Sequence, residues 1–348
     1  MLKKLTDMKK RILVTGGTGY IGSHTTVELI NAGFDVVIID DLSNSRREVL
    51  DGIEKITGVK PVFEEFNLIE TEKVIGFFKK HKNIEAIIHF AANKAVGESV
   101  KNPLKYYENN IISLINLLKI MKDTDVKDIV FSSSCTVYGQ PDILPATENT
   151  PIKKAESPYG NTKQICEEII YDSVMAYKNI KCISLRYFNP IGAHPSAFIG
   201  ELPQGVPDNL IPYVTQTAIG IRDYLRVFGS NYNTRDGSCI RDYINVVDLA
   251  KAHVIAIKRL IEKKNKSSFE VFNLGTGEGT TTLEIVKTFE KANNLKLNYK
   301  IVDRREGDIE KVWADTSYAN RELGWKAVET LEDTLRSAWK WEQSLRKE

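Results

Sequence analysis

The sequence has little cysteine, little histidine and no long hydrophobic run, and each shortage excludes a class of protein. Among its 348 residues are four cysteines, Cys135, Cys166, Cys182 and Cys239. None has the CxxC spacing of a zinc site, so we expect reduced thiols in a cytoplasmic protein. The five histidines are scattered, and no metal is expected. The longest apolar stretches, such as Ile111–Leu118, are too short to span a bilayer, so no membrane association is predicted.

The basic and acidic residues are nearly equal in number, which argues against binding to nucleic acid or to a membrane surface. The chain holds 48 basic and 46 acidic residues, a net charge of +2, so no overall field attracts it to nucleic acid or to a membrane surface. The composition, 42% apolar and 27% charged, is that of a globular protein with a large core. At roughly 150 residues per domain, the length of the chain predicts two domains, or one large domain with an appendage.

The first 190 residues alternate short strand patterns with longer helical ones, which predicts an α/β fold with a Rossmann-like, doubly wound parallel sheet. The predicted strands are Arg11–Thr15, Asp35–Ile39, Lys60–Phe63, Ala86–Phe90, Asp128–Ser132 and Lys181–Arg186. The predicted helices between them are Ile21–Ala32, Arg46–Thr57, Thr71–His81, Pro103–Met121 and Tyr159–Tyr177.

The pattern loosens after Phe188, which predicts a smaller α+β C-terminal lobe. Residues 9–190 would form the larger domain, joined by a returning segment at about 239–275, where a helix again precedes a strand. Residues 191–238 and 276–348 would form the second lobe. Its predicted helices are Asn209–Ile221, Thr282–Ala292 and Leu331–Leu345, and the returning segment would hold a helix at Asn245–Ile261 and a strand at Val271–Leu274.

A glycine-rich loop follows the first predicted strand and opens the first predicted helix. Gly16, Gly19 and Gly22 have the spacing of a dinucleotide-binding loop, and Gly17 completes the GxGxxG form. Such a loop turns sharply, lets a pyrophosphate approach the backbone and places that anion at a helix N-terminus.

Two acids at the end of the second predicted strand indicate which nicotinamide cofactor would bind. A carboxylate at Asp40 can accept hydrogen bonds from the adenosine ribose hydroxyls, and it would repel a 2′-phosphate. Asp41 adds to that repulsion. The cofactor predicted is therefore NAD rather than NADP.

Tyr159 and Lys163 form a YxxxK pattern at the start of a predicted helix. Residues four apart lie on one helix face, so the phenol and the ammonium can serve one site. A phenolate costs about 4 kcal/mol at pH 7, and a cation about 4 Å away supplies about as much at an intermediate dielectric. Tyr159 is therefore a candidate base near neutrality. The motif alone is common, but Ser132, Ser133 and Ser134 end the fifth predicted strand, where ligands of open α/β sheets bind.

Several longer motifs carry a family resemblance. They are TGGTGYIGSH, HFAANKAVGESV, FSSSCTVYG, SPYGNTK, LRYFNPIGAHPS, RDYINVVDLA and RREGD. Together they resemble the UDP-galactose (UDP-glucose) 4-epimerases of the extended short-chain dehydrogenase/reductase family, from about Lys10 to Trp341. The resemblance implies a retained NAD, a UDP-hexose substrate, inversion at C4 through a 4-keto sugar, and a homodimer.

The resemblance also implies roles for individual residues. Tyr159 would take the proton of the sugar O4 hydroxyl, Ser134 would hydrogen-bond the same oxygen, and Lys163 would lower the pKa of Tyr159 and hold the nicotinamide ribose. The cofactor contacts implied are Gly16, Gly19, Tyr20, Ile21, Gly22, Asp40, Asp41, Leu42, Ser43, Asn44, Ser45, Asn67, Leu68, Phe90, Ala91, Ala92, Lys94, Asn109, Ser134, Tyr159, Lys163 and Phe188. The substrate contacts implied are Ser134, Tyr159, Asn189, Asn209, Leu210, Val227, Phe228, Arg241, Arg305 and Asp308.

The chain departs from the family at a few of these positions. Asn67–Leu68 stands where an Asp–Ile pair is common beside the adenine, Asp41 where Asn is frequent, and Cys135 where Ala is frequent. Val312 occupies a position that is bulky in some relatives and small in others. A small residue there widens the hexose pocket, which predicts that N-acetylated UDP-hexosamines are also accepted.

The sequence also bears on three other functions of proteins with this fold. A 4,6-dehydratase needs an acid and a base just after the strand-end hydroxyl, but no Asp or Glu follows Ser134 until Asp142, which disfavours it. A UDP-uronate 4-epimerase, or another NAD-dependent nucleotide-sugar enzyme, remains an alternative. An NAD-sensing binding module is the least favoured, because the chain keeps Ser134, Tyr159 and Lys163.

Overall fold

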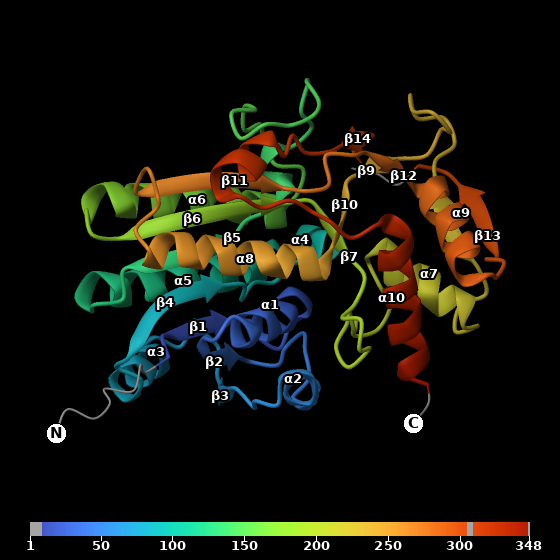
Figure 1. Ribbon diagram of the computed structural model, residues 1–348. Helices are drawn as coiled ribbons and strands as arrows, with labels where there is room; N and C mark the ends of the chain where they lie inside the picture. Colours follow the sequence, from blue (N-terminus) through green and yellow to red (C-terminus); the bar gives the residue numbers. More distant parts are fainter. Residues whose placement is uncertain (1–8, 305–308, 347–348) are drawn as a thin grey trace.

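A computed structural model describes residues 9–304 and 309–346, and its largest element is a parallel sheet (Figure 1). The seven strands of this sheet are β1 (Arg11–Thr15), β2 (Asp35–Asp40), β3 (Val62–Glu65), β4 (Ile84–His89), β5 (Asp128–Ser132), β6 (Lys181–Tyr187) and β11 (Phe269–Leu274). They lie in the order β11-β6-β5-β4-β1-β2-β3, and every pairing is parallel. The predicted Rossmann-like fold class is therefore confirmed.

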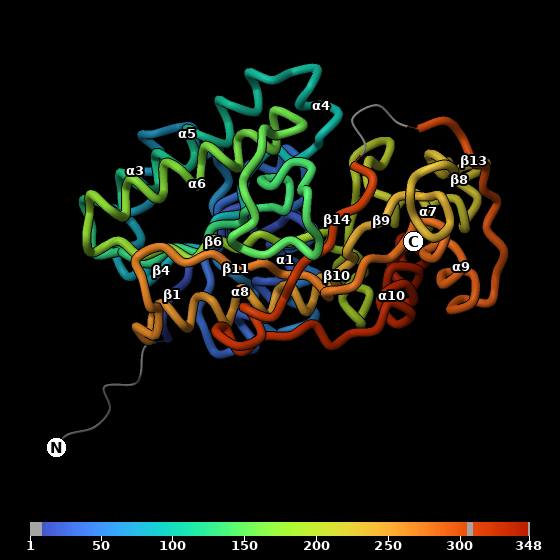
Figure 2. Tube along the Cα trace, turned by 90° about the horizontal axis from the view of Figure 1, so that it is seen from above, coloured from blue at the N-terminus to red at the C-terminus, as the bar shows by residue number. Residues whose placement is uncertain are grey.

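Helices cover both faces of the sheet. They are α1 (Tyr20–Asn31), α2 (Val49–Thr57), α3 (Thr71–Lys80), α4 (Val96–Lys101), α5 (Pro103–Asp123), α6 (Pro158–Ala176) and α8 (Val246–Ile261). Seen from above, α5 and α6 lie on one side of the strands and α8 on the other (Figure 2).

Alternation along the strands builds the two halves of the core. Ile12 and Val14 of β1 are buried in the cluster with α1 and α8, whereas Leu13 is buried in the cluster with α3, α5 and α6. Because both faces are covered, the central strands are almost continuously apolar, as expected for a parallel sheet.

A smaller lobe of helices and short strands packs beside the carboxyl ends of the sheet strands (Figure 1). Its helices are α7 (Leu210–Ala218), α9 (Thr282–Asn293) and α10 (Leu331–Ser344). Its short strands are β8 (Leu225–Phe228), β9 (Ile240–Arg241), β12 (Thr280–Thr281), β13 (Tyr299–Val302) and β14 (Lys311–Val312). Strands β7 (Asn189–Ile191) and β10 (Tyr243–Asn245) pair in parallel where the chain passes between the sheet and this lobe.

The differences from the predicted elements have local causes. The third strand begins at Val62 rather than Lys60, since Pro61 has no N–H for the sheet. The helix predicted from Arg46 begins at Val49, after a turn in which the amide of Val49 donates to the oxygen of Arg46. The one-turn helices α4, Cys135–Tyr138 and Ala319–Leu323 and the short strands of the smaller lobe were not predicted, since they are too short to show a period.

No helix in the described ranges combines the length and apolar character needed to cross a membrane. Across the same residues, no group of His, Cys, Asp or Glu side chains could hold a metal ion.

Candidate active site

The glycine loop joins the end of β1 to the start of α1 with no room for side chains. Gly16 has φ +71°, and a Cβ atom there would lie 2.8 Å from the backbone nitrogen of Ala91. A Cβ atom on Gly22 would collide with the backbone oxygen of Gly16. Gly19 caps α1 without a side-chain hydrogen bond, and no acid lies in the first turn that follows, which begins with Tyr20 and Ile21. The loop therefore offers backbone groups, rather than side chains, to a ligand that binds over it.

Asp40 ends β2 and organises the loop beside the glycines. Its carboxylate accepts hydrogen bonds from the amide of Thr18 at 3.1 Å, the amide of Leu42 at 3.0 Å and the hydroxyl of Ser45 at 3.1 Å. Leu42 has φ +58°, which lets the chain wrap around this carboxylate. The predicted contact segment 41–45 thus lies against the glycine loop.

The fold brings together predicted cofactor contacts from three separate segments, among them the adenine pair Asn67–Leu68. The side-chain amide of Asn67 donates to Asp41 Oδ2 at 2.7 Å and to Asn109 Oδ1 at 3.3 Å. The next residue, Leu68, is buried, and its carbonyl accepts from the side chain of Asn116 at 2.9 Å. Asn67 therefore links the ends of β2 and β3 to α5.

The segment after β4 closes the same edge. The amide of Phe90 donates to the carbonyl of Thr15 at 3.0 Å, and the ring of Phe90 packs against that of His253 at 4.7 Å between centroids. Ala91 and Ala92 follow at the rim, and Lys94 reaches Glu201, with 3.6 Å between Nζ and Oε1.

These features fit a dinucleotide. Glycine at positions 16 and 22 lets the loop fold tightly against backbone atoms of the protein, as a dinucleotide-binding loop requires, and the neighbouring carboxylates of Asp40 and Asp41 suit ribose hydroxyls but not a further phosphate. All of these groups follow carboxyl ends of parallel strands, where ligands of this fold class bind.

The predicted catalytic side chains meet at the same edge. Tyr159 and Lys163 lie one turn apart on α6, whose first turn is capped by Ser157, since its hydroxyl accepts from the amide of Gly160 at 3.1 Å. Tyr159 is 8% exposed and Lys163 is 4% exposed. The Nζ of Lys163 donates to the carbonyl of Ser132 at 2.6 Å and lies 5.9 Å from the centroid of the Tyr159 ring.

Burial dominates the acid–base properties of this pair. It raises the pKa of Tyr159 well above the ordinary value, Tyr187 adds to that rise, and a side-chain hydrogen bond with Ser134 opposes it. Burial also lowers the pKa of Lys163 to about 8, while Cys166 and Glu167 oppose that change. Burial therefore favours the neutral phenol of Tyr159.

The three consecutive serines have three different surroundings. The hydroxyl of Ser132 pairs with Tyr187 Oη at 2.5 Å, and that of Ser133 donates to Glu167 at 2.6 Å. Ser134 caps the one-turn helix Cys135–Tyr138 and is the serine that contacts Tyr159. Of the three hydroxyls, that of Ser134 is placed for the chemistry predicted.

Asn189, a predicted substrate contact, begins β7, where the chain passes between the sheet and the smaller lobe. It follows Phe188, a predicted cofactor contact, and its amide donates to the carbonyl of Asp242 at 2.9 Å. Asn189 Oδ1 is buried and finds no hydrogen-bond partner within the described chain, which suits a group that awaits a ligand.

The other predicted substrate contacts are spread over the smaller lobe. Asn209 and Leu210 begin α7, Val227 and Phe228 end β8, and Arg241 ends β9. Arg305 and Asp308 lie outside the described residues.

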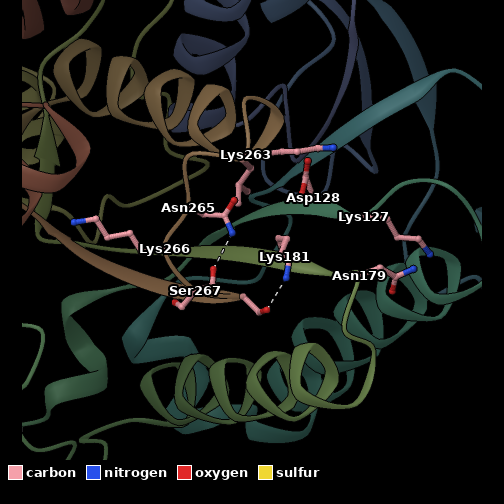
Figure 3. A pocket seen from close by; sticks show the side chains of 10 residues that line it. Lys127, Asp128, Asn179, Lys181, Lys263, Asn265, Lys266 and Ser267 are labelled. Carbon is pink, nitrogen blue, oxygen red and sulfur yellow. Dashed lines mark hydrogen bonds between the residues drawn. The ribbon is translucent and has the colours of Figure 1, made fainter.

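A separate hollow of about 570 Å³ lies at the opposite end of the sheet (Figure 3). Two of its lysines are held by the protein itself: Lys127 Nζ donates to the carbonyl of Met121 at 2.6 Å, and Lys181 Nζ donates to Ser268 Oγ at 2.7 Å. This hollow stands before the amino ends of β5, β6 and β11, away from Tyr159, and forms no part of the candidate site.

Some residues that shape the site were not predicted. Tyr187, Glu167 and Asn110 are buried polar residues, and Asn110 donates to Thr162 Oγ1 at 3.0 Å beneath Tyr159. Their sequence signal is a polar residue inside an otherwise apolar strand or helix face. That signal does not say which buried partner each one meets.

The fold and the site together define an extended short-chain dehydrogenase/reductase, and comparisons with known proteins agree. Residues 13–338 match the family model described as GDP-mannose 4,6 dehydratase. The chain is 50% identical over 332 residues to UDP-glucose 4-epimerase of Dictyostelium discoideum, covering 95% of each chain. It is 50% identical over 333 residues to that of Bacillus subtilis (strain 168), covering 96% of this chain and 97% of the relative.

A solved structure extends the likeness to three dimensions. It is UDP-glucose-4-epimerase from Stenotrophomonas maltophila with bound NAD and formylated UDP-arabinopyranose. Its TM-score is 0.93 at 45% identity, and the match covers 97% of this chain and 99% of that one. The chain belongs to the UDP-glucose 4-epimerase family.

Proposed function

We propose that this protein interconverts UDP-galactose and UDP-glucose by inverting C4 of the hexose through a 4-keto intermediate. The observation that carries the proposal is the contact between Ser134 and Tyr159, with Lys163 one turn away, beside a glycine loop and at the carboxyl edge of the sheet. A hydroxyl and a phenol placed together there suit the removal and return of an alcohol proton.

The cofactor proposed is NAD, which when bound supplies an acceptor for the C4 hydride and returns that hydride, so that net oxidation is zero. The loop of Gly16, Gly19 and Gly22 would hold its pyrophosphate, and Asp40 its adenosine ribose. Asn67, Leu68 and Asn109 would line the adenine, and Phe90, Lys94, Lys163 and Phe188 the nicotinamide half.

Tyr159 would accept the proton of the sugar O4 hydroxyl and give it back after the ring has turned, while Ser134 hydrogen-bonds the same oxygen. The ammonium of Lys163 stabilises negative charge that develops nearby, because it lies in a buried setting where charges are weakly screened. The low exposure of both side chains keeps water from competing for that proton.

The diphosphate end of the substrate would be held by Arg241 and Arg305, with Asn189 beside them. Asp308 would face the uridine ribose, and Asn209, Leu210, Val227 and Phe228 would lie near the rest of the nucleotide. A firm grip on this remote end anchors the intermediate, so the hexose itself can be held loosely enough to turn over.

The test is incubation of the purified protein with UDP-galactose and no added reductant. UDP-glucose should accumulate until both sugars reach a fixed ratio, with no net change in absorbance near 340 nm. An absence of turnover by protein that retains a dinucleotide would favour the sensing module instead. Turnover of UDP-glucuronate with none of UDP-galactose would favour the uronate epimerase.

We propose a cytoplasmic homodimer built on α5 and α6, which leave Leu104, Ile112, Tyr171 and Met175 at least partly exposed. Light scattering on the purified chain tests the dimer.

We also propose that residues 9–190 and about 239–275 act as the nucleotide-binding unit and the remainder as the substrate lobe.

A further inference from the structure

Two residues of α6 hold the chain at the end of β5. Lys163 Nζ donates to the carbonyl of Ser132 at 2.6 Å. The side chain of Ser133 donates to Glu167 Oε1 at 2.6 Å. Lys163 and Glu167 are four residues apart and therefore lie on one face of the helix. The next residue along the chain, Ser134, carries the hydroxyl that contacts Tyr159.

Glu167 is itself fixed by a buried set of donors. Arg186 approaches both carboxylate oxygens, with Nε at 3.0 Å and 3.2 Å and Nη2 at 2.6 Å, and Ser184 Oγ donates to Oε1 at 2.7 Å. Both charged side chains are about nine-tenths buried or more. A bidentate pair in such a setting has one geometry, so Glu167 is a rigid point of attachment.

From this geometry we infer that Ser133 and Glu167 are positioning residues that fix the Ser134 hydroxyl against Tyr159. The inference rests on the proposed function. The backbone of Ser133 is already held, since its amide donates to the carbonyl of Leu185 at 3.0 Å. The hydroxyl bond to Glu167 adds a second restraint, which fixes the rotation of the chain just before Ser134. Small displacements of a catalytic group cost large factors in rate.

The chain offers a matched control for this bond. Ser133 and Ser184 are both fully buried, and each donates one hydrogen bond to the same oxygen of Glu167. Only Ser133 is adjacent to Ser134, because Ser184 lies in the middle of β6. Ser133→Ala and Ser184→Ala therefore each remove one buried hydroxyl that donates to Glu167. Only position 133 is next in the chain to the catalytic Ser134.

The experiment measures kcat, KM and the isotope effect of deuterium at C4 of UDP-galactose for the wild type and both variants. We expect Ser133→Ala to lower kcat by about tenfold with little change in KM, and to raise the isotope effect as the chemical step becomes slower. Ser184→Ala should change kcat and the isotope effect much less, because Arg186 still holds both oxygens of Glu167 and the bond to Ser133 remains, while it loses thermal stability comparably.

Equal kcat and equal isotope effects in the two variants would overturn the inference, because the network would then serve only the fold. A wild-type protein that did not convert UDP-galactose would overturn the proposed function itself. The wild-type measurement thus separates the two failures.

Discussion

The Nζ atom of Lys163 donates a 2.6 Å hydrogen bond to the backbone carbonyl of Ser132, the last residue of β5. The YxxxK spacing predicts that this ammonium serves the phenol of Tyr159. In the structure the ammonium also ties α6 to the end of the strand that precedes the catalytic Ser134. Lys163 therefore has a structural contact as well as the electrostatic role proposed for it.

The first prediction concerns the phenol. Tyr159→Phe should lower turnover of UDP-galactose by at least about 100-fold, because the proton acceptor is lost while the ring still fills its place. The dinucleotide content should be unchanged. Tyr171→Phe is the control, since Tyr171 lies on the same helix but is half exposed. Full activity in Tyr159→Phe would refute the proposed mechanism.

The second prediction compares the effect of an alanine substitution at Gly22 with that of one at Gly76. Gly22→Ala should yield protein without bound dinucleotide, because the added Cβ would collide with the Gly16 oxygen and open the loop. Gly76→Ala is the matched control: Gly76 lies in α3, and a Cβ there meets nothing within 4 Å. It should gain up to about 1 kcal/mol in the free energy of unfolding. The dinucleotide released on denaturation measures the difference, and equal content in both variants would contradict it.

The third prediction is loss of stability in mild acid. Burial lowers the pKa of His24 and His89 to about 3 and that of His253 to about 4. Between these values and about 6.5 the unfolded chain binds more protons than the folded one, so stability falls as pH drops through this window. Each histidine should cost roughly 2 kcal/mol between pH 7.5 and pH 5.

Urea denaturation at the two pH values measures that loss. His253→Leu removes one of these three titrating groups, at a site with no exposure. Between pH 7.5 and pH 5 the free energy of unfolding of this variant should therefore fall by about one third less than that of the wild type. An equal fall in the two proteins would show that His253 does not contribute.

The fourth prediction concerns the hexose pocket. Val312 is 4% exposed and packs in one cluster with Phe188 and Tyr138, near the proposed reaction site. UDP-N-acetylgalactosamine should be converted by the wild type, and Val312→Tyr should abolish this while it keeps UDP-galactose turnover, because the larger ring fills the space of an N-acetyl group. A wild-type protein that does not detectably convert UDP-N-acetylgalactosamine would contradict this prediction.

The sequence predicted the sheet well because its strands are apolar runs that alternate with longer helical patterns. It also placed Asp40, Ser134 and Tyr159 at element ends, since short motifs mark those ends. The weak points were the short strands and one-turn helices, such as β9 and α4, which tertiary contacts stabilise rather than local preference.

By itself, then, the sequence determined the fold class, the glycine loop and the identity of the side chains at the strand ends, because these follow from periodicity and from backbone sterics. The tertiary structure alone decided which polar residues meet. Asn67 reaches Asp41 and Asn109, and Ser133 reaches Glu167, across chain separations that no local pattern encodes. It also decided that burial favours the neutral phenol of Tyr159, because desolvation depends on everything packed around a group and not on its neighbours in the chain.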